Sequence, residues 1–427
     1  MSELQSLTAT ELKERENILR EKYAKFQSEN INLDMSRGKP APEQLDLSLG
    51  LLSVLPETGA FKDRNGTDVR NYGQLDGIPE AKTLFGDLLG VSEDNIFIGG
   101  NSSLSLMYDT IARAMLYGVA EDEVPWMKLP KVKFLCPSPG YDRHFAICEL
   151  FQIEMIPIEM TPTGPNMDQV EQYVNNDDAI KGIWCVPKYS NPEGHTYSED
   201  VVERLANMET KATDFRIFWD NAYVIHHLTD TPDELADIFA ASDRANNPNR
   251  VYMYASTSKV TFPGAGISAF VSSEENIAFA KKQLSVQTIG ADKLNQLRHV
   301  RFFEQVGGIE KLMEQHAAII KPKFDQVAQS LDQALSGKGI ASWSNPNGGY
   351  FISLDTIDGC AKRVVLLAKE AGVTLTGAGA TFPYGHDPKD RNIRIAPTFP
   401  SVDELKQAME ILCLCIELAA IEELQRH

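Results

Sequence analysis

Residues 254–259 read Tyr-Ala-Ser-Thr-Ser-Lys, a run of hydroxyl side chains that ends on Lys259 directly after the apolar segment 250–254. The amine of a lysine serves an enzyme chiefly by forming an imine with an aldehyde. The hydroxyls of Ser256 and Ser258 offer hydrogen-bond donors to a phosphate. The stretch therefore predicts a strand that presents a reactive lysine beside an anion site, and a solvated surface lysine is the alternative.

Two segments upstream of the lysine carry matching side chains. The apolar run 215–219 has the pattern of a buried strand, and Asp220 follows at its end. An acid in that place can keep a pyridine nitrogen protonated, so that the ring accepts electrons. The turn 190–194, Ser-Asn-Pro-Glu-Gly, could bring Asn191 to a ring hydroxyl. Together with Lys259 these residues predict pyridoxal phosphate (PLP) as cofactor, although Asp220 could also cap a helix and Asn191-Pro192 could simply form a turn.

Four motifs follow one another in an order that resembles class I aminotransferases of PLP fold type I. They are Asn191-Pro192-x-Gly194, Asp220-x-Ala222-Tyr223, Ser256-x-Ser258-Lys259 and Asn392-Ile393-Arg394-Ile395. Within that family the chain is most similar to a divergent aspartate aminotransferase subgroup, through Ser36-Arg37-Gly38-Lys39-Pro40 and Asn71-Tyr72-Gly73-Gln74-Leu75-Asp76-Gly77. The resemblance extends from about residue 33 to residue 401.

The resemblance implies a role for individual residues. Catalysis would fall to Lys259, Asp220 and Tyr223, and the substrate would be bound by Arg37, Gly38, Asn191 and Arg394. The cofactor would be held by Asn101, Ser102, Ser103, Tyr141, Asn191, Asp220, Tyr223, Ser256, Ser258 and Lys259, and by Tyr72 from the other subunit of a homodimer. The guanidinium of Arg394 suits an α-carboxylate because it can form two parallel hydrogen bonds. Taken alone, Tyr141 could be a packing residue, Tyr72 a turn residue and Arg394 a member of a surface ion pair.

The segment 99–103, Gly-Gly-Asn-Ser-Ser, follows a predicted strand and opens a predicted helix. Backbone amides at the start of a helix attract anions, so the segment predicts a phosphate site, with an ordinary helix cap as the alternative. Similar proteins place an arginine for the phosphate shortly after the lysine, but residues 260–268 contain none. The phosphate would then depend on Ser102, Ser103, Ser256, Ser258, the helix dipole and a lysine that the sequence does not place.

Strands and helices alternate between about residues 45 and 287, which predicts a doubly wound sheet. The expected strands are 95–98, 132–135, 153–158, 180–186, 215–219, 251–254 and 266–271. With the resemblance, we expect an α/β protein of PLP fold type I, in which a large domain with a mostly parallel seven-stranded sheet between helices joins a smaller α+β domain. The expected bounds are 1–45 for an N-terminal segment joining the small domain, 46–321 for the large PLP-binding domain and 322–427 for the small domain.

Helical segments are expected on both sides of this region. Residues 8–30 predict an exposed amphipathic helix opened by Thr10. Residues 309–335 predict a long helix that Pro322 should kink or split. Ser401 and Glu404 form a capping-box pattern, which predicts a final helix up to residue 424.

Composition limits the partners. The chain has 427 residues, 43% of them hydrophobic, which predicts two domains with sizeable cores. Its formal net charge of -19 argues against nucleic acid or an anionic membrane as a partner. We expect a cytoplasmic protein, because no apolar run reaches the length of a membrane span and the N-terminal residues are charged. The six cysteines lack paired spacing, so no metal site is expected.

The resemblance implies amino transfer by a ping-pong mechanism. The donor would be aspartate or glutamate and the acceptor 2-oxoglutarate or oxaloacetate, with Arg37 as a candidate for binding the distal carboxylate. Within the same chemistry, an aromatic, 2-aminoadipate or kynurenine-type aminotransferase and a PLP β-lyase stay open. An aminotransferase-like transcription regulator is a third class, but too little chain precedes residue 33 for a DNA-binding module, and the chain is acidic.

Overall fold

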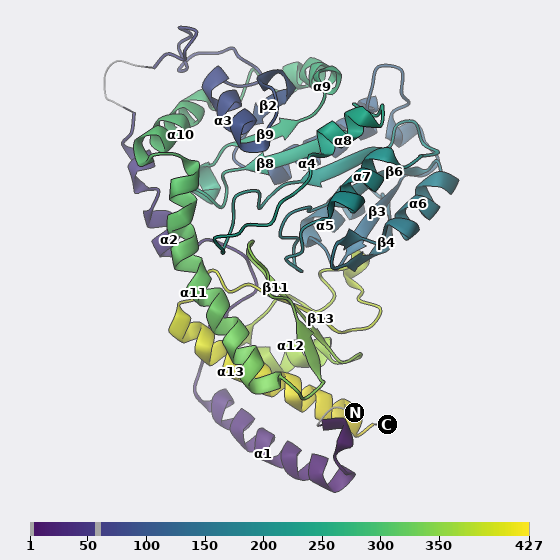
Figure 1. Cartoon of the computed structure of the whole chain (residues 1–427), viewed down its shortest axis with the longest axis vertical. Helices are drawn as coiled ribbons and strands as arrows, with labels where there is room; N and C mark the ends of the chain where they lie inside the picture. Colours follow the sequence, from purple (N-terminus) through teal and green to yellow (C-terminus); the bar gives the residue numbers. More distant parts are fainter. Residues whose placement is uncertain (1–3, 56–60, 427) are drawn as a thin grey trace.

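The computed structural model describes residues 4–55 and 61–426. Residues 1–3 and 427, which the expected domain bounds include, lie outside the described residues, as do residues 56–60. Figure 1 shows a large sheet with its helices above a smaller sheet, and the long helix α11 (Ile309–Leu335) runs along one side from the upper to the lower part.

The large sheet has eight strands in the order β2-β9-β8-β7-β6-β3-β4-β5. Its strands are β2 (Ile96–Gly99), β3 (Lys133–Ser138), β4 (Glu154–Thr161), β5 (Gly164–Pro165), β6 (Ile180–Cys185), β7 (Arg216–Asp220), β8 (Val251–Ser256) and β9 (Ser268–Val271). The core strands pair in parallel, whereas β9 is antiparallel to both of its neighbours and β5 is antiparallel to β4. All seven expected strands are present, and β5, of two residues, is an eighth that the alternating pattern did not reveal.

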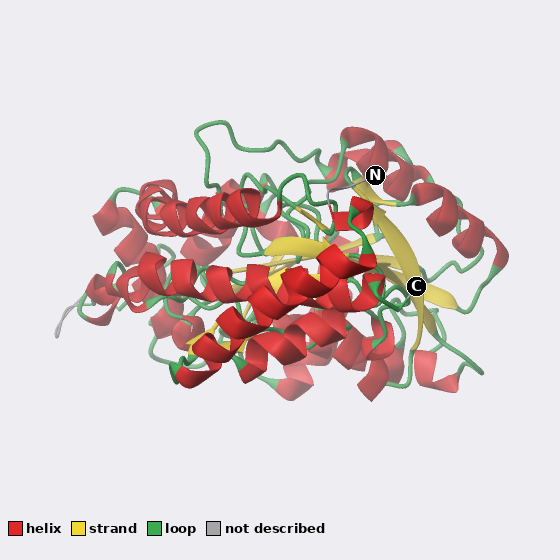
Figure 2. Ribbon diagram, turned by 90° about the horizontal axis from the view of Figure 1, so that it is seen from below, coloured by secondary structure: helices red, strands yellow, loops and turns green. Residues whose placement is uncertain are grey.

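Helices cover both faces of this sheet, as Figure 2 shows. They are α3 (Pro79–Leu89), α4 (Ser103–Tyr117), α5 (Asp142–Leu150), α6 (Met167–Asn176), α7 (Glu199–Asn207), α8 (Ile238–Arg244), α9 (Glu274–Gln287) and α10 (Lys293–Val306). Two separate clusters of buried apolar residues lie against the sheet, one containing Ile183 and Trp219 and the other Phe134 and Phe218. Alternate residues of β7 thus point to opposite faces, which explains why this strand reads as continuously apolar.

The smaller part is built from helices and two short sheets. Its elements are α1 (Ala9–Ser28), β1 (Leu33–Asp34), α2 (Pro42–Asp46), β10 (Ala341–Trp343), β11 (Ile352–Thr356), α12 (Ala361–Glu370), β12 (Val373–Thr374), β13 (Asn392–Ile395) and α13 (Val402–Leu424). Strands β10, β11 and β13 form an antiparallel sheet, and β1 pairs in parallel with β12. Short 3-10 turns complete the chain: η1 (Leu4–Ser6), η2 (Leu49–Leu52), η3 (Glu93–Asn95), η4 (Trp126–Lys128), η5 (Pro263–Ala265) and η6 (Pro383–Gly385).

Two expectations about helices are corrected. Helix α1 is capped by Thr8 and not by Thr10, because Glu11 stands three residues after Thr8 and closes a capping box with it. Helix α11 does not split at Pro322 and continues to Leu335. The expected domain boundary at 321/322 thus falls inside a continuous helix, and the bounds stay a prediction.

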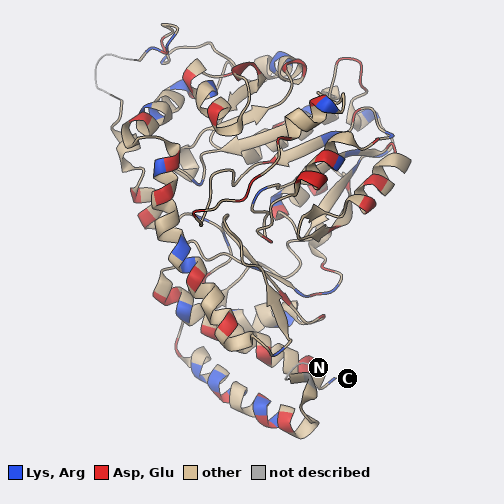
Figure 3. Ribbon diagram, in the orientation of Figure 1, with Lys and Arg blue, Asp and Glu red and all other residues tan. Residues whose placement is uncertain are grey.

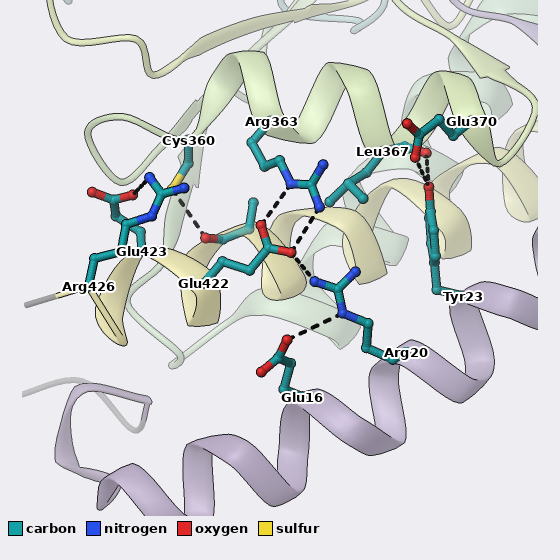
Figure 4. A network of polar contacts seen from close by, with 11 residues as sticks. Glu16, Arg20, Tyr23, Cys360, Arg363, Leu367, Glu370, Glu422, Glu423 and Arg426 are labelled. Atoms are coloured by element: carbon teal, nitrogen blue, oxygen red, sulfur yellow. Dashed lines mark hydrogen bonds and ion pairs between the residues drawn. The ribbon is translucent and has the colours of Figure 1, made fainter.

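Helix α1 packs on the smaller part through one face. Figure 4 shows Arg20 and Arg363 converging on Glu422 of α13, with Arg363 Nε 2.7 Å from Glu422 Oε2. The hydroxyl of Tyr23 donates a hydrogen bond of 2.8 Å to the carbonyl of Leu367. These contacts hold α1 against α12 and α13, and the chain after α1 continues into β1, which pairs with β12.

Charged residues lie mainly on the outer helices, with both signs intermixed (Figure 3). In the described part of the chain, every helix is too short or too polar to span a lipid bilayer.

Candidate active site

A cavity of about 540 Å³ lies where strands of the large sheet end and the smaller part begins. Strands β12 and β13 of the smaller part contribute Thr374 and Arg394 to it. From the large sheet it receives residues at or just after the ends of five strands, β2, β3, β6, β7 and β8. Ligands of open α/β sheets bind beyond the carboxyl ends of the strands, which is where these residues lie. The predicted site residues that line the cavity are Arg37, Gly38, Ser102, Ser103, Tyr141, Asn191, Asp220, Tyr223, Ser256, Ser258, Lys259 and Arg394.

Lys259 follows β8 and faces the cavity. The surrounding protein lowers the pKa of its amine by desolvation, and the nearby charge of Asp220 opposes this effect. Its Nζ lies 5.2 Å from the ring centre of Tyr223 and 5.9 Å from that of Tyr350. A lysine with a lowered pKa is more often neutral, which makes its nitrogen available as a nucleophile or base.

Asp220 ends β7 and is buried. One oxygen, Oδ2, lies 3.0 Å from His144 Nε2, and the ring of His144 stacks on Trp184 at a centroid distance of 4.3 Å. The other oxygen, Oδ1, is buried without a hydrogen-bond partner among the described residues. Buried acceptors are normally satisfied, so Oδ1 is suited to a hydrogen-bond donor on a ligand.

Two tyrosines, Tyr141 and Tyr223, lie near this aspartate. Burial and then the charge of Asp220 raise the pKa of Tyr141 to about 12. Burial likewise raises the pKa of Tyr223 well above its ordinary value, with the nearby Tyr141 and Asp220 adding to the effect. Both hydroxyls therefore stay protonated at neutral pH and can donate hydrogen bonds.

The start of α4 and the end of β8 form a small cup of hydroxyls. Ser102 caps α4 by accepting a hydrogen bond of 3.1 Å from the amide of Leu104. Ser256 Oγ donates to Ser258 Oγ at 3.1 Å, and Ser258 Oγ donates to the carbonyl of Asn101 at 2.9 Å. Hydroxyls beside a helix N-terminus are suited to a phosphate or another anion.

The positive charges around the cavity do not come from the segment that follows Lys259. Among the described residues that line it, the arginines and lysines are Arg37, Lys39, Arg143, Lys259 and Arg394. The segment after Lys259 contributes none, and the side chain of Asn295 donates to the carbonyls of Ala265 and Gly266 at 3.0 and 2.9 Å. The structure therefore places no arginine of that segment at the cup.

Arg394 is presented by β13 and is only 6% exposed. Its Nη1 lies 3.0 Å from Asp142 Oδ1 and 3.3 Å from Asn191 Oδ1, and its Nε donates to Thr376 Oγ1 at 3.4 Å. The guanidinium lies over the ring of Phe351 at 4.7 Å. The head group is thus oriented from several sides, as binding a planar carboxylate requires.

The segment 36–39 forms another wall of the cavity. A Cβ atom on Gly38 would stand 2.5 Å from Phe351 Cζ, so only glycine lets the backbone pass so close to this ring. Arg37 is exposed and forms no ion pair within the described part of the chain. Its guanidinium is available to a charged group of a ligand.

Two predicted site residues do not line the cavity. The side chain of Asn101 donates to the carbonyl of Pro263 at 3.1 Å, so that only its backbone meets the cup. Tyr72 is 81% exposed on the surface, and its role toward a second subunit stays a prediction.

Several residues of the site were not predicted. Asp142, Arg143 and Thr376 line the cavity, and His144 supports Asp220 from behind. Asp142, Arg143 and His144 directly follow Tyr141, so their proximity to a predicted cofactor residue was the available signal. Thr376 lies in a loop after β12, and only the tertiary structure brings it to Arg394.

Comparison with known proteins agrees with this geometry. A family model described as aspartate amino-transferase matches residues 7–427. The aspartate aminotransferase of Corynebacterium glutamicum is 48% identical over 404 residues, which cover 95% of this chain and 93% of that protein. The crystal structure of an aspartate transaminase from the same organism has a TM-score of 0.96 at 46% identity and covers 99% of both chains.

A more distant structure shares the fold alone. The α-aminoadipate aminotransferase of Thermus thermophilus, solved with N-(5'-phosphopyridoxyl)-L-leucine, has a TM-score of 0.73 at 17% identity and covers 94% of this chain and 95% of that one. The expected PLP fold type I is confirmed by these structures. Since the family model spans nearly the whole chain and a relative is almost half identical along it, the chain belongs to the aspartate aminotransferase family and is an aminotransferase.

Proposed function

We propose that the cavity binds PLP at Lys259 and that the enzyme moves an amino group between a dicarboxylic L-amino acid and a 2-oxoacid. One observation carries the proposal. Asp220 ends β7 and Lys259 follows β8, the parallel strand beside it; both residues line the same cavity, and Asp220 keeps one buried oxygen without a partner among the described residues. A protonated pyridine nitrogen is the donor that such an oxygen would accept.

The other residues fit the remaining parts of the cofactor. The cup at Ser102, Ser103, Ser256 and Ser258 would hold the phosphate through hydroxyls and the N-terminus of α4. Asn191 and Tyr223 would bind the ring hydroxyl, and Tyr141 would pack on the ring. A buried carboxylate oxygen without a partner and a lysine of lowered pKa in one cavity are the combination that this cofactor requires.

The chemistry of these side chains suggests a separate role for each in the reaction. Bound PLP would supply an electron sink for the electrons of a broken Cα–H bond. Asp220 would accept a hydrogen bond from the ring nitrogen through Oδ1, because His144 holds the other carboxylate oxygen. Lys259 would take the proton from the substrate Cα and deliver it again, since a lysine of lowered pKa can act in both directions near neutral pH.

The arginines support a substrate with two carboxylates. Arg394 is buried and oriented, which suits the invariant α-carboxylate of an amino acid. Arg37 is exposed at the wall of the cavity and would bind the distal carboxylate of aspartate, glutamate or 2-oxoglutarate. The Corynebacterium glutamicum relative is named for one of these substrates, aspartate.

A homodimer is part of this proposal. Tyr72 is 81% exposed and precedes Gly73-Gln74-Leu75-Asp76-Gly77, a segment fixed to the large part through Lys82 and Lys281, which both bind Asp76 Oδ2. A fixed segment that presents an exposed tyrosine is suited to reach a second subunit. Tyr72 would then complete the phosphate cup of the other chain.

The test is the visible absorption spectrum of the purified protein during titration with aspartate and then with 2-oxoglutarate. A reversible change of the cofactor band, together with labelling of Lys259 after borohydride reduction and peptide mapping, is the expected result. Pyruvate and ammonia formed without an acceptor would indicate a β-lyase, and a preference for aromatic donors would overturn the substrate assignment. A label on another lysine would refute the proposed cofactor site.

A further inference from the structure

Three buried side chains form a hydrogen-bonded cluster at the backbone of the segment that bears Lys259. They are Gln44 of α2, His316 of α11 and Tyr350, which precedes β11. Their exposed fractions are 0%, 1% and 1%, and none of them lines the cavity. We call these three residues the carbonyl clasp, because two of them bind backbone carbonyls in the lysine segment.

The clasp contacts two consecutive carbonyls. The hydroxyl of Tyr350 lies 3.4 Å from the carbonyl oxygen of Lys259, and His316 Nε2 lies 2.9 Å from that of Val260. Gln44 joins the two side chains, because its Nε2 lies 3.0 Å from the hydroxyl of Tyr350 and 3.1 Å from His316 Nδ1. Its Oε1 accepts a hydrogen bond of 3.0 Å from the amide of Ala41.

These distances allow one assignment of all the protons. A carbonyl only accepts, so His316 Nε2 must donate to Val260, and Nδ1 of the neutral ring must then accept from Gln44. Burial lowers the pKa of His316, which favours this neutral ring. The second hydrogen on Gln44 Nε2 goes to Tyr350, whose own hydrogen goes to Lys259. Each polar hydrogen of the three side chains then has one acceptor, the carbonyl of Val260 also accepts from Ser48 Oγ at 3.4 Å, and such a network favours one geometry.

The clasp links three parts of the chain that are distant in sequence. Gln44 follows the wall segment 36–39, His316 belongs to the helix that runs between the two parts of the molecule, and Tyr350 adjoins Phe351, which lies under Arg394. All three meet at the backbone of the segment that bears Lys259. Their hydrogen bonds therefore connect the walls of the substrate cavity to the position of the lysine.

We propose that the carbonyl clasp is a positioning device for Lys259, which sets the height and direction of its side chain relative to the substrate cavity. The inference rests on the proposed function, in which Lys259 carries the cofactor and transfers the proton. The clasp does not line the cavity, so it acts on Lys259 through the backbone carbonyls and through the ring of Tyr350, whose centre lies 5.9 Å from Lys259 Nζ. Proton transfer depends steeply on distance, and a misplacement of about 1 Å can cost about a hundredfold in rate.

The test variant is Gln44→Leu, which removes the central amide and with it the links to His316 and Tyr350. The matched control is Asn276→Leu on α9, because Asn276 is also buried and its amide donates two hydrogen bonds, to the carbonyl of Asn249 and the hydroxyl of Ser272. Both variants lose a buried amide and should lose comparable thermal stability. Only Gln44→Leu is expected to change kcat and the pH titration of the cofactor bound at Lys259.

We expect kcat of the Gln44→Leu holoenzyme to fall about tenfold to a hundredfold while KM for aspartate stays within about threefold. The pH at which the visible band of the loaded protein titrates should shift by about half a unit or more, and Asn276→Leu should keep the wild-type kcat and titration. If both variants lose stability alone, with kcat and titration unchanged, the clasp is only a packing feature and the proposal is wrong.

Tyr350→Phe serves if Gln44→Leu does not fold, since it removes one hydroxyl and the contact with the carbonyl of Lys259. The same shift in titration, smaller in size, is expected, and no shift in this variant would overturn the proposal. Borohydride mapping of the wild-type protein is done first. A label away from Lys259 refutes the proposed function, whereas a label on Lys259 with unaffected variants refutes the clasp alone.

Discussion

Arg394 Nη1 lies 3.0 Å from Asp142 Oδ1, so the arginine proposed to bind the substrate carboxylate already pairs with a carboxylate of the chain itself. The side chain of Arg394 is 6% exposed and that of Asp142 is 36% exposed. A substrate carboxylate that binds Arg394 would bring a second negative charge close to Asp142. A substrate carboxylate bound there would therefore compete with Asp142 for the same guanidinium.

Asp142→Asn should tighten the binding of dicarboxylates, because the amide keeps the size of the side chain and removes its charge. Two like charges about 4 Å apart repel by about 1 kcal/mol in water and by more where water is excluded. Removing the charge of Asp142 should therefore lower the Kd of succinate about tenfold. The measurement is the change in the visible band of the holoenzyme with succinate. Asp168→Asn is the control, since Asp168 pairs with Arg204 on the surface. Weaker binding in Asp142→Asn would mean that Asp142 chiefly orients Arg394.

Arg394→Lys should lower kcat/KM for aspartate about tenfold to a hundredfold. Lysine keeps the charge but loses the planar fork and the hydrogen bonds to Asn191 and Thr376, and hydrogen bonds to charged groups are worth about 1.5 to 3 kcal/mol. Steady-state kinetics with aspartate and 2-oxoglutarate measure the effect. A variant with wild-type kcat/KM would show that the α-carboxylate binds elsewhere.

Arg37→Ala should selectively impair substrates with a second carboxylate. Loss of Arg37 removes a positive charge from the wall of the cavity, so the ratio of kcat/KM for aspartate to that for alanine should fall about tenfold or more. Arg143→Ala is the informative comparison, because Arg143 also lines the cavity and is exposed. If the ratio falls in Arg143→Ala and not in Arg37→Ala, the distal carboxylate binds to Arg143.

The apolar strand pattern of the sequence predicted most of the large sheet. Seven strands of the large sheet are at the expected places, because buried parallel strands are continuous apolar runs that end in polar turns. β5 escaped notice because two residues, one of them Pro165, form no periodic pattern. Pro322 was expected to kink or split α11. The helix does not split, because the packing of buried residues such as Phe324 and Val327 outweighs the cost of one missing hydrogen bond.

From residue chemistry alone, the site could be predicted where reactive side chains stand at strand ends, whereas Gly38 and Arg394 were assigned through the family resemblance. Lys259 and Asp220 each follow an apolar strand, so the parallel sheet necessarily brings them to one edge. Gln44 and His316 have no such signal, since a glutamine in a short helix and a histidine on a long one are ordinary core residues until the fold joins them. Contacts between parts of the chain that are far apart in sequence are what the sequence alone does not reveal.

Gly38→Ala should damage the substrate cavity with little effect on cofactor binding. The new Cβ would stand 2.5 Å from Phe351 Cζ, and the ring of Phe351 supports Arg394. Relieving the clash costs about 1 to 3 kcal/mol and should raise KM for aspartate about tenfold. The absorption of the loaded protein should stay that of the wild type. Gly264→Ala is the control, because a Cβ there meets no atom within 4 Å, and an unchanged KM in Gly38→Ala would show that the ring can move freely.

Glu193 makes stability depend on pH. Its carboxyl is largely buried, two residues after Asn191 of the cavity. The Oε2 atom has no hydrogen-bond partner among the described residues, and His195 Nδ1 lies 3.7 Å from it. Burial, and then the charge of Asp355, raises the pKa of Glu193 to about 8, although Arg391 acts in the opposite direction. Burial also lowers the pKa of His195, so a proton on His195 does not compensate.

Glu193→Gln should therefore stabilise the protein in alkaline solution and not in acid. Above about pH 4.5 the unfolded chain loses the proton of Glu193 while the folded protein keeps it, so the folded wild type loses stability as the pH rises, up to about pH 8. Glutamine cannot ionise, so the difference in unfolding free energy should grow by up to about 1.4 kcal/mol per pH unit across this window. Urea unfolding of both proteins between pH 5 and 9 measures it. A difference that is constant with pH would show that Glu193 titrates normally, and a variant that is less stable at pH 9 would show that an ionised Glu193 is favourably paired.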